Sequence, residues 1–274
     1  MRFTKMQGLG NDYVYVNCFE EQIKEPALAA KAVSDRHFGI GADGLILIFP
    51  SETADCRMEM YNADGSRGAM CGNGIRCVGK YVYEAGIVKT AKMKIETDSG
   101  IRKLFCRTRN GNVNLVDVEM GIPVVEKRET ILADGQKISF TPVNMGNPHA
   151  VLFYSDVDSI DVLRLGPLIE RNKRFPDRTN VEFVQVLDEQ NIRLRVWERG
   201  SGETLACGTG ACAACAAAIV MGVIKRKTMV HLQGGSLDIT WAGIQEPMIM
   251  TGPAVEVFRG EIVLEDLTLK EDSG

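Results

Sequence analysis

The chain repeats itself at a fixed spacing of 136 residues. The pattern Cys-Gly-x-Gly begins at Cys71 and again at Cys207, and Gly10-Asn11 recurs as Gly146-Asn147 at the same spacing. A strand-like segment before each Cys-Gly-x-Gly also aligns, arginine on arginine and aromatic on aromatic. Two units of this length account for nearly all of the 274 residues. We therefore expect two similar halves, related by an approximate two-fold axis.

Each half has the pattern of an α/β unit. Stretches with period-two alternation, at 3–17 and at 138–154, precede the Cys-Gly-x-Gly pattern, and an apolar helical stretch follows it. Similar segments that begin at Met120 and Met250 indicate a boundary near residue 117. The predicted division is 1–117, completed by 262–274, for the N-terminal half and 118–261 for the C-terminal half.

The composition is that of an ordinary globular protein, with 45% hydrophobic residues, 25% charged residues and a net charge of -4. This balance disfavours a nucleic acid or a membrane as partner. The first residues lack the apolar core of a signal peptide, which predicts a cytoplasmic protein. The uncharged run 205–224 is too rich in alanine and glycine for a membrane span, so we expect a buried helix there.

The eight cysteines are expected to be reduced thiols in that compartment. Cys212 and Cys215 form a Cys-x-x-Cys pair, but a zinc site needs a second pair of ligands, and the three histidines are scattered. We interpret the pair as small apolar residues of the helix and expect no metal.

The Cys-Gly-x-Gly elements predict acid/base chemistry. A cysteine at the start of a helix lies where backbone N–H groups and the helix dipole favour negative charge, so its thiol should ionise more easily than a free thiol. The glycines let a substrate carboxylate approach the same N–H groups. Two such elements facing one cleft would invert a stereocentre, because one sulfur removes the α-proton and the other returns a proton to the opposite face.

Five segments resemble the diaminopimelate epimerase family in order and spacing. The resemblance implies an α/β fold of two pseudo-symmetric halves, each a β-sheet or barrel wrapped around a central helix, with the active site in the cleft between them. It also implies conversion of LL-diaminopimelate to the meso isomer, a precursor of lysine and peptidoglycan, without a cofactor. The segments lie at 8–12, 62–66, 70–77, 146–149 and 198–210.

The same resemblance, carried over position by position, implies a set of site residues. Cys71 and Cys207 match the two acid/base thiols. An arginine fork with side-chain amides suits the carboxylate at the end of the substrate that is not inverted. The implied substrate-binding residues are Asn11, Asn62, Gly72, Asn73, Asn147, Asn180, Glu198, Arg199, Gly208 and Thr209.

The repeat predicts that this site is asymmetric. Asn62 aligns with Glu198, and Gly44 aligns with Asn180, so the two halves can distinguish the reacting end of the substrate from the distal end. Gly44 also departs from the family pattern, since some members carry a side-chain amide there, and we leave it out of the site.

Other functions are compatible with the same residues. Proline racemases and hydroxyproline epimerases share the Cys-Gly-x-Gly elements but typically carry histidine where Asn73 stands. The cysteines also allow a non-catalytic binding protein or a thiol-redox or zinc protein. A pyridoxal-phosphate racemase is disfavoured, because two thiols make the cofactor unnecessary. A homodimer is compatible with the sequence, which by itself decides no oligomeric state.

Overall fold

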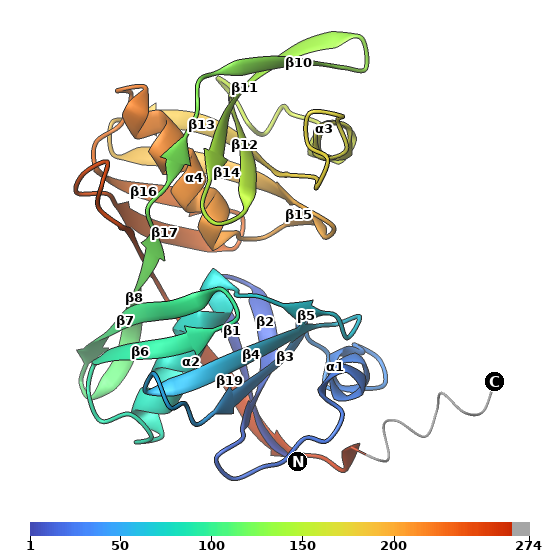
Figure 1. The fold of residues 1–274 in the computed structure, drawn as a ribbon, viewed down its shortest axis with the longest axis vertical. Coiled ribbons are helices and arrows are strands. Elements are labelled where there is room, and N and C mark those ends of the chain that lie inside the picture. The colour runs from blue at the N-terminus through green and yellow to red at the C-terminus, as the bar shows by residue number, and fades with distance from the viewer. Residues whose placement is uncertain (265–274) are drawn as a thin grey trace, which may run out of the picture. The chain divides into compact units, whose positions relative to one another are not determined.

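The computed structural model describes residues 1–264, and two compact units in it repeat one topology (Figure 1). Of the described residues, the first unit comprises 1–118 and 252–264, and the second comprises Glu119–Thr251. The helices recur at the spacing of the sequence repeat. They are α1 (Pro26–Ser34) and α2 (Gly72–Glu84) in the first unit, and α3 (Val162–Glu170) and α4 (Gly208–Val220) in the second.

The first unit is built on one mixed sheet. Its strands are β1 (Arg2–Gly8), β2 (Asn11–Asn17), β3 (Gly44–Phe49), β4 (Cys56–Asn62), β5 (Arg67–Gly68), β6 (Lys92–Thr97), β7 (Gly100–Arg109), β8 (Asn112–Gly121) and β19 (Val255–Glu261). They pair in the order β19-β1-β2-β3-β4-β6-β7-β8, with β5 beside β4. The pairs β2–β3 and β4–β6 are parallel.

The second unit repeats this order. Its strands are β9 (Val124–Val125), β10 (Glu129–Ala133), β11 (Gln136–Asn144), β12 (Pro148–Phe153), β13 (Asn180–Asp188), β14 (Asn191–Glu198), β15 (Gly202–Thr204), β16 (Lys227–Leu232), β17 (Gly235–Thr240) and β18 (Met248–Gly252). They pair in the order β9-β11-β12-β13-β14-β16-β17-β18, with β10 beside β11 and β15 beside β14. The parallel pairs β12–β13 and β14–β16 are the equivalents of those in the first unit.

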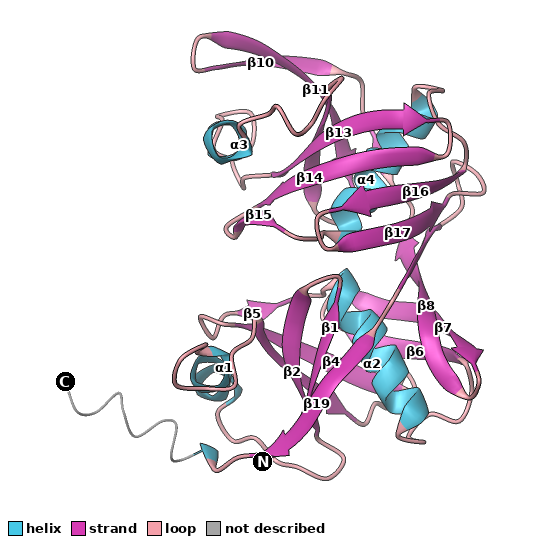
Figure 2. Cartoon of the chain, turned by 180° about the vertical axis from the view of Figure 1, so that it is seen from behind, coloured by secondary structure: helices cyan, strands magenta, loops and turns pink. Residues whose placement is uncertain are grey.

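The sheet of each unit wraps around one helix (Figure 2). α2 contacts β1, β2 and β7, and α4 contacts β9, β11–β14 and β17. Every residue of α4 from Gly210 to Ala218 is buried, because glycine, alanine and cysteine are small enough for strands to pack closely on all sides. The buried helix predicted within 205–224 and the α/β fold with a central helix in each half are therefore confirmed. Within residues 1–264, no helix is long and apolar enough to span a membrane.

The chain returns to the first unit earlier than the sequence indicated. Residues 252–261 were expected in the C-terminal half, but β19 pairs antiparallel with β1, with Val255 opposite Gln7. β9 pairs with β11 in the same way, with Val125 opposite Val143. The similarity between the segments at Met120 and Met250 therefore reflects two equivalent edge strands, and sequence alone does not say which sheet the later one joins. The predicted return of residues 265–274 lies outside the described residues.

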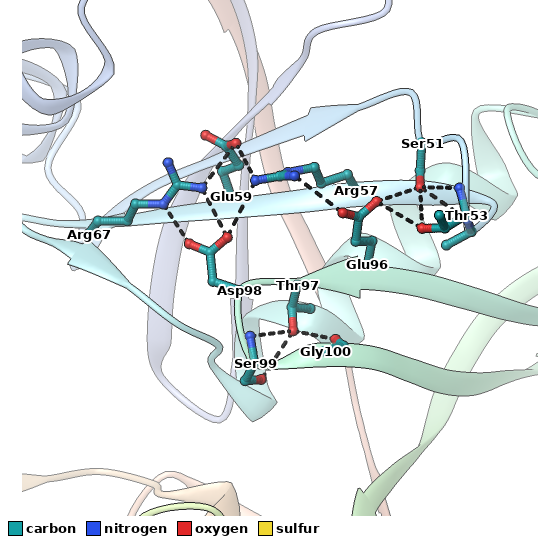
Figure 3. A network of polar contacts seen from close by, with 11 residues as sticks. Ser51, Thr53, Arg57, Glu59, Arg67, Glu96, Thr97, Asp98, Ser99 and Gly100 are labelled. Carbon is teal, nitrogen blue, oxygen red and sulfur yellow. Dashed lines mark hydrogen bonds and ion pairs between the residues drawn. The ribbon is translucent and has the colours of Figure 1, made fainter.

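Ion pairs hold the chain that leads to the first Cys-Gly-x-Gly turn (Figure 3). Arg67, on β5, pairs with Glu59 at 3.1 Å and also with Asp98, beyond the end of β6. Arg57 pairs with the same Glu59 at 3.0 Å and with Glu96 at 3.2 Å. β4, β5 and the β6–β7 turn are thereby joined four residues before Cys71.

The contact between α3 and β14 gives a test of packing in the second unit. A Cβ atom at Gly166 would lie 2.5 Å from the ring of Trp197. Alanine has the higher helix propensity by about 1 kcal/mol, but overpacking costs about 1–3 kcal/mol, so we expect Gly166→Ala to lower the free energy of unfolding by up to about 2 kcal/mol. Urea unfolding followed by tryptophan fluorescence measures this, since both tryptophans lie in the second unit.

The matched control for this substitution is Gly243→Ala. There a Cβ atom would meet its nearest neighbour, in Glu246, at an ordinary 3.5 Å, so we expect a change within about 0.5 kcal/mol. A Gly166→Ala protein more stable than the parent would show that the ring of Trp197 moves aside without cost.

Candidate active site

A cysteine caps the central helix of each unit. Cys71 precedes α2 and Cys207 precedes α4, both in extended conformation with φ of -124°. The Cys71 Sγ accepts a hydrogen bond from the N–H of Gly74 at 3.3 Å, and the Cys207 Sγ accepts one from the N–H of Gly210 at 3.4 Å. Each sulfur thus takes the place of the oxygen acceptor that normally caps a helix.

The second glycine of each pattern is required by packing. A Cβ atom at Gly74 would lie 2.7 Å from Ile46 Cδ1, and one at Gly210 would lie 2.9 Å from Glu182 Oε1. Ile46 and Glu182 are equivalent positions of the repeat, on β3 and β13. The same turn therefore packs on an apolar side chain in the first unit and on a carboxylate in the second.

The first unit brings four of the predicted residues together at the start of α2. Asn11, at the start of β2, has its Oδ1 3.1 Å from the Cys71 Sγ, and Gly72 and Asn73 form the first turn of the helix. Asn62 ends β4, where its Nδ2 donates to the hydroxyl of Ser66 at 2.9 Å.

The environment of Cys207 favours the protonated thiol. Burial raises the pKa of Cys207 well above its usual value, and the nearby carboxylates of Glu198 and Glu182 raise it further. Hydrogen bonds from Thr209 and Gly210 lower the pKa but do not outweigh burial. The expectation that a helix start makes the thiol ionise easily is therefore wrong for Cys207, because desolvation is the larger effect.

Glu198 is itself a partly buried carboxyl group. Burial raises its pKa, while hydrogen bonds from Thr204 and from the Cys207 thiol lower it. The Thr204 hydroxyl donates to Glu198 Oε1 at 2.5 Å. Glu198, Cys207, Gly208 and Thr209 thus gather around the start of α4.

A buried chain of polar groups lies beside them. The Nδ1 of His149 is 2.7 Å from Glu182 Oε1, and its Nε2 is 3.0 Å from Asn147 Oδ1. Burial raises the pKa of Glu182, and His149 opposes that rise. Sequence reasoning missed Glu182, although the repeat carries the signal, since a glutamate there aligns with Ile46 of a buried strand.

Two polar side chains hold the turn that carries Arg199. Asn180 Oδ1 accepts the backbone N–H of Arg199 at 3.0 Å, and Asn180 Nδ2 donates to the carbonyl of Pro148. Glu170, buried at the end of α3, accepts the N–H of Gly200 at 3.1 Å and the indole N–H of Trp197 at 2.8 Å. Sequence reasoning did not identify this role of Glu170.

Gly44 has no space for the side-chain amide that some family members carry. A Cβ atom there would lie 2.1 Å from the carbonyl oxygen of Tyr61, on the neighbouring strand β4. The backbone at Gly44 therefore differs from the backbone at the equivalent position, Asn180, in addition to the difference in side chain.

Two of the remaining cysteines are buried thiols with no access to solvent. Cys212 and Cys215 are fully buried in α4, and burial raises the pKa of Cys212 to about 12. Among residues 1–264, no group of three histidine, cysteine, aspartate or glutamate side chains could hold a metal ion.

The fold of this protein resembles that of several solved structures. A hydroxyproline epimerase from Agrobacterium vitis superposes with a TM-score of 0.74 at 17% identity, over 95% of this chain and 91% of that one. A methylitaconate-delta-isomerase superposes with a TM-score of 0.69 at 13% identity, over 98% and 96%. At such low identity these likenesses establish the fold alone.

Sequence similarity then gives the family. The family model described as diaminopimelate epimerase matches residues 3–126 and 141–257. The chain is 50% identical to a diaminopimelate epimerase of Acetivibrio thermocellus, over 97% of this chain and all of that protein. It is 48% identical to one of Methanococcus maripaludis, over 96% and 99%. The chain belongs to the diaminopimelate epimerase family and is an isomerase, as the resemblance implied.

The negative charge of Glu198 near Cys207 predicts a measurable effect on the reactivity of the Cys207 thiol. Replacing Glu198 by glutamine removes a negative charge and a strong acceptor for the thiol hydrogen, and both changes lower the pKa of Cys207. We expect the pH midpoint for iodoacetamide labelling of Cys207, followed by mass spectrometry, to fall by about one unit in Glu198→Gln.

Glu203→Gln is the control for this shift. It removes a carboxylate that pairs with Arg195 at 2.8 Å on the neighbouring strand, and none of the effects on the pKa of Cys207 comes from it. An equal shift in both variants would show that Glu198 has no direct influence on the sulfur.

Proposed function

We propose that this protein converts LL-diaminopimelate to meso-diaminopimelate with Cys71 and Cys207 as its two acid/base groups and without a cofactor. One observation carries the proposal: in a member of the diaminopimelate epimerase family, two cysteines occupy equivalent N-cap positions of the two central helices. The presence of a thiol at both equivalent positions supports a reaction that needs one group on each face of a carbon atom.

In the proposed reaction the thiolate of one cysteine removes the α-proton and becomes a thiol. The electron pair of the broken C–H bond moves toward the carboxylate, where the backbone N–H groups of Gly72, Asn73, Gly208 and Thr209 stabilise the charge. The second cysteine donates its proton to the opposite face and becomes a thiolate. The raised pKa of Cys207 supports a proton donor on its side.

We propose that the amino-acid end that is not inverted is held by Asn62, Asn147, Asn180, Glu198 and Arg199, with Asn11 beside Cys71. Hydrogen bonds fix the backbone of Arg199 and Gly200, and the exposed guanidinium of Arg199 donates to the carbonyl of Asp177 at 3.1 Å. This anchored turn supports a role for Arg199 as a fork for a carboxylate. Asn62 and Glu198 are equivalent positions with different chemistry, which supports discrimination between the two ends.

We also place the reaction in the cytoplasm. All eight cysteines lie within residues 1–264 and are present as thiols, which fits a reducing compartment. The proposed substrate is a small molecule. Cys71 belongs to the first unit and Cys207 to the second.

Removing either thiol should stop the reaction. We expect Cys71→Ala and Cys207→Ala each to lower the rate of meso-isomer formation by at least about a hundredfold, because neither sulfur can serve both faces. Proton NMR in D₂O with LL-diaminopimelate reports inversion and exchange at the α-carbon together. Cys18→Ala, which removes a thiol whose pKa burial raises to about 11, should remain active. A single active-site variant with parental turnover would rule out two-base catalysis.

The proposed carboxylate fork can be tested separately. Arg199→Lys keeps the positive charge but loses the planar pair of donors, so we expect KM to rise at least about tenfold. Arg193→Lys, at an arginine paired with Asp158 at 2.6 Å on the surface, is the control and should leave KM unchanged. An unchanged KM in Arg199→Lys would mean that Arg199 binds no carboxylate.

A further inference from the structure

The side chain of Asn11 joins Cys71 to a carboxylate that none of the site predictions included. Asn11 Oδ1 lies 3.1 Å from the Cys71 Sγ, and Asn11 Nδ2 lies 2.8 Å from Asp43 Oδ2. Asp43 directly precedes β3, and Asn11 begins β2, the parallel partner of β3. The two side chains meet because these strands start side by side.

The carboxylate of Asp43 is held from several directions. Its Oδ2 also accepts the backbone N–H of Asp12 at 3.1 Å, and its Oδ1 pairs with the guanidinium of Arg36 at 3.0 Å. The backbone N–H of Asp43 donates to the carbonyl of Asp12 at 2.8 Å. Arg36 in turn pairs with the side chain of Asp12, which also pairs with Lys5 at 2.7 Å. This network fixes the position of Asp43 before any substrate binds.

We propose that Asp43 is a positioning residue that sets which end of the Asn11 amide faces Cys71. A carboxylate that receives hydrogen bonds from a guanidinium and a backbone N–H can only accept, so the NH₂ group of Asn11 must face Asp43. The carbonyl oxygen of the amide is then directed at the sulfur. An oxygen can accept the S–H hydrogen but repels a thiolate, so Asp43 stabilises the protonated form of Cys71 through Asn11.

The second unit orients its equivalent asparagine by another means. Asn147 Oδ1 lies 3.0 Å from His149 Nε2, and the position equivalent to Asp43 is Thr179, whose hydroxyl donates to the carbonyl of Asn180. The two equivalent asparagines are therefore held by different groups, an aspartate in one unit and a histidine in the other.

The test is the pH dependence of iodoacetamide labelling of Cys71, read by mass spectrometry on the full-length protein. In Asp43→Asn the new amide can accept from Asn11 or donate to it, so the Asn11 amide is free to turn and donate to a thiolate. We expect the labelling midpoint to fall by about one pH unit. The other titratable groups that face Cys71, which are Tyr15, Arg76 and Cys77, are unchanged in this variant.

Asp12→Asn is the matched control. It removes a carboxylate from the same network but leaves the bond between Asp43 and Asn11 in place. A smaller midpoint shift in Asp12→Asn than in Asp43→Asn supports the proposal. Equal shifts in the two variants, or no shift in Asp43→Asn, overturn it, because charge alone would then account for the result.

A measurement on the unaltered protein covers the case in which Asp43→Asn does not fold. Nuclear Overhauser contacts from the side-chain NH₂ of Asn11 to the β-protons of Asp43 support the proposal, and contacts to the β-protons of Cys71 overturn it. The inference rests on the proposed function only for the role of Cys71 in catalysis. Neither measurement requires turnover, so an inactive enzyme with the expected labelling shift would contradict the proposed function and leave the role of Asp43 intact.

Discussion

The enclosure of one helix by a curved sheet is the constraint on which the rest of each unit depends. A helix surrounded by strands must carry small or apolar side chains on every face, and α4 does so from Gly210 to Ala218. α2 departs from this rule with a fully buried Arg76, whose Nε donates to the carbonyl of Pro253 and whose Nη1 donates to that of Gly72. Because the helix cannot shift within its sheet, the cysteine at its start has a fixed position within the unit.

Two electrostatic effects oppose each other at that position. The first N–H groups of a helix stabilise a thiolate, whereas burial and neighbouring carboxylates destabilise it. At Cys207 the second effect is larger, with Glu198 and Glu182 both contributing. The carboxylates of Glu198 and Glu182 thus favour the protonated Cys207 thiol. In the proposed reaction Cys207 donates that proton.

The two units show how one backbone can hold two different environments. Tyr13 and Ile46 in the first unit correspond to His149 and Glu182 in the second, so a buried histidine–glutamate hydrogen bond in one stands where the other has a buried tyrosine and isoleucine. The repeat preserves the helix, the cap and the order of the strands, whereas the side chains on β2, β3, β12 and β13 set the chemistry of each thiol.

The sequence by itself determined the repeat, the two central helices, the family and the set of residues that the family pattern marks, because each of these leaves a local signal such as Cys-Gly-x-Gly or a run of alanine. Only the tertiary structure decided which sheet receives the strand at 255–261, since an edge strand has the same alternation wherever it pairs. It likewise decided the direction in which the pKa of Cys207 is shifted, and the contacts of Asp43, Glu170 and Glu182. Burial and hydrogen bonding between residues 27–33 positions apart depend on how strands are brought side by side, which no local pattern records.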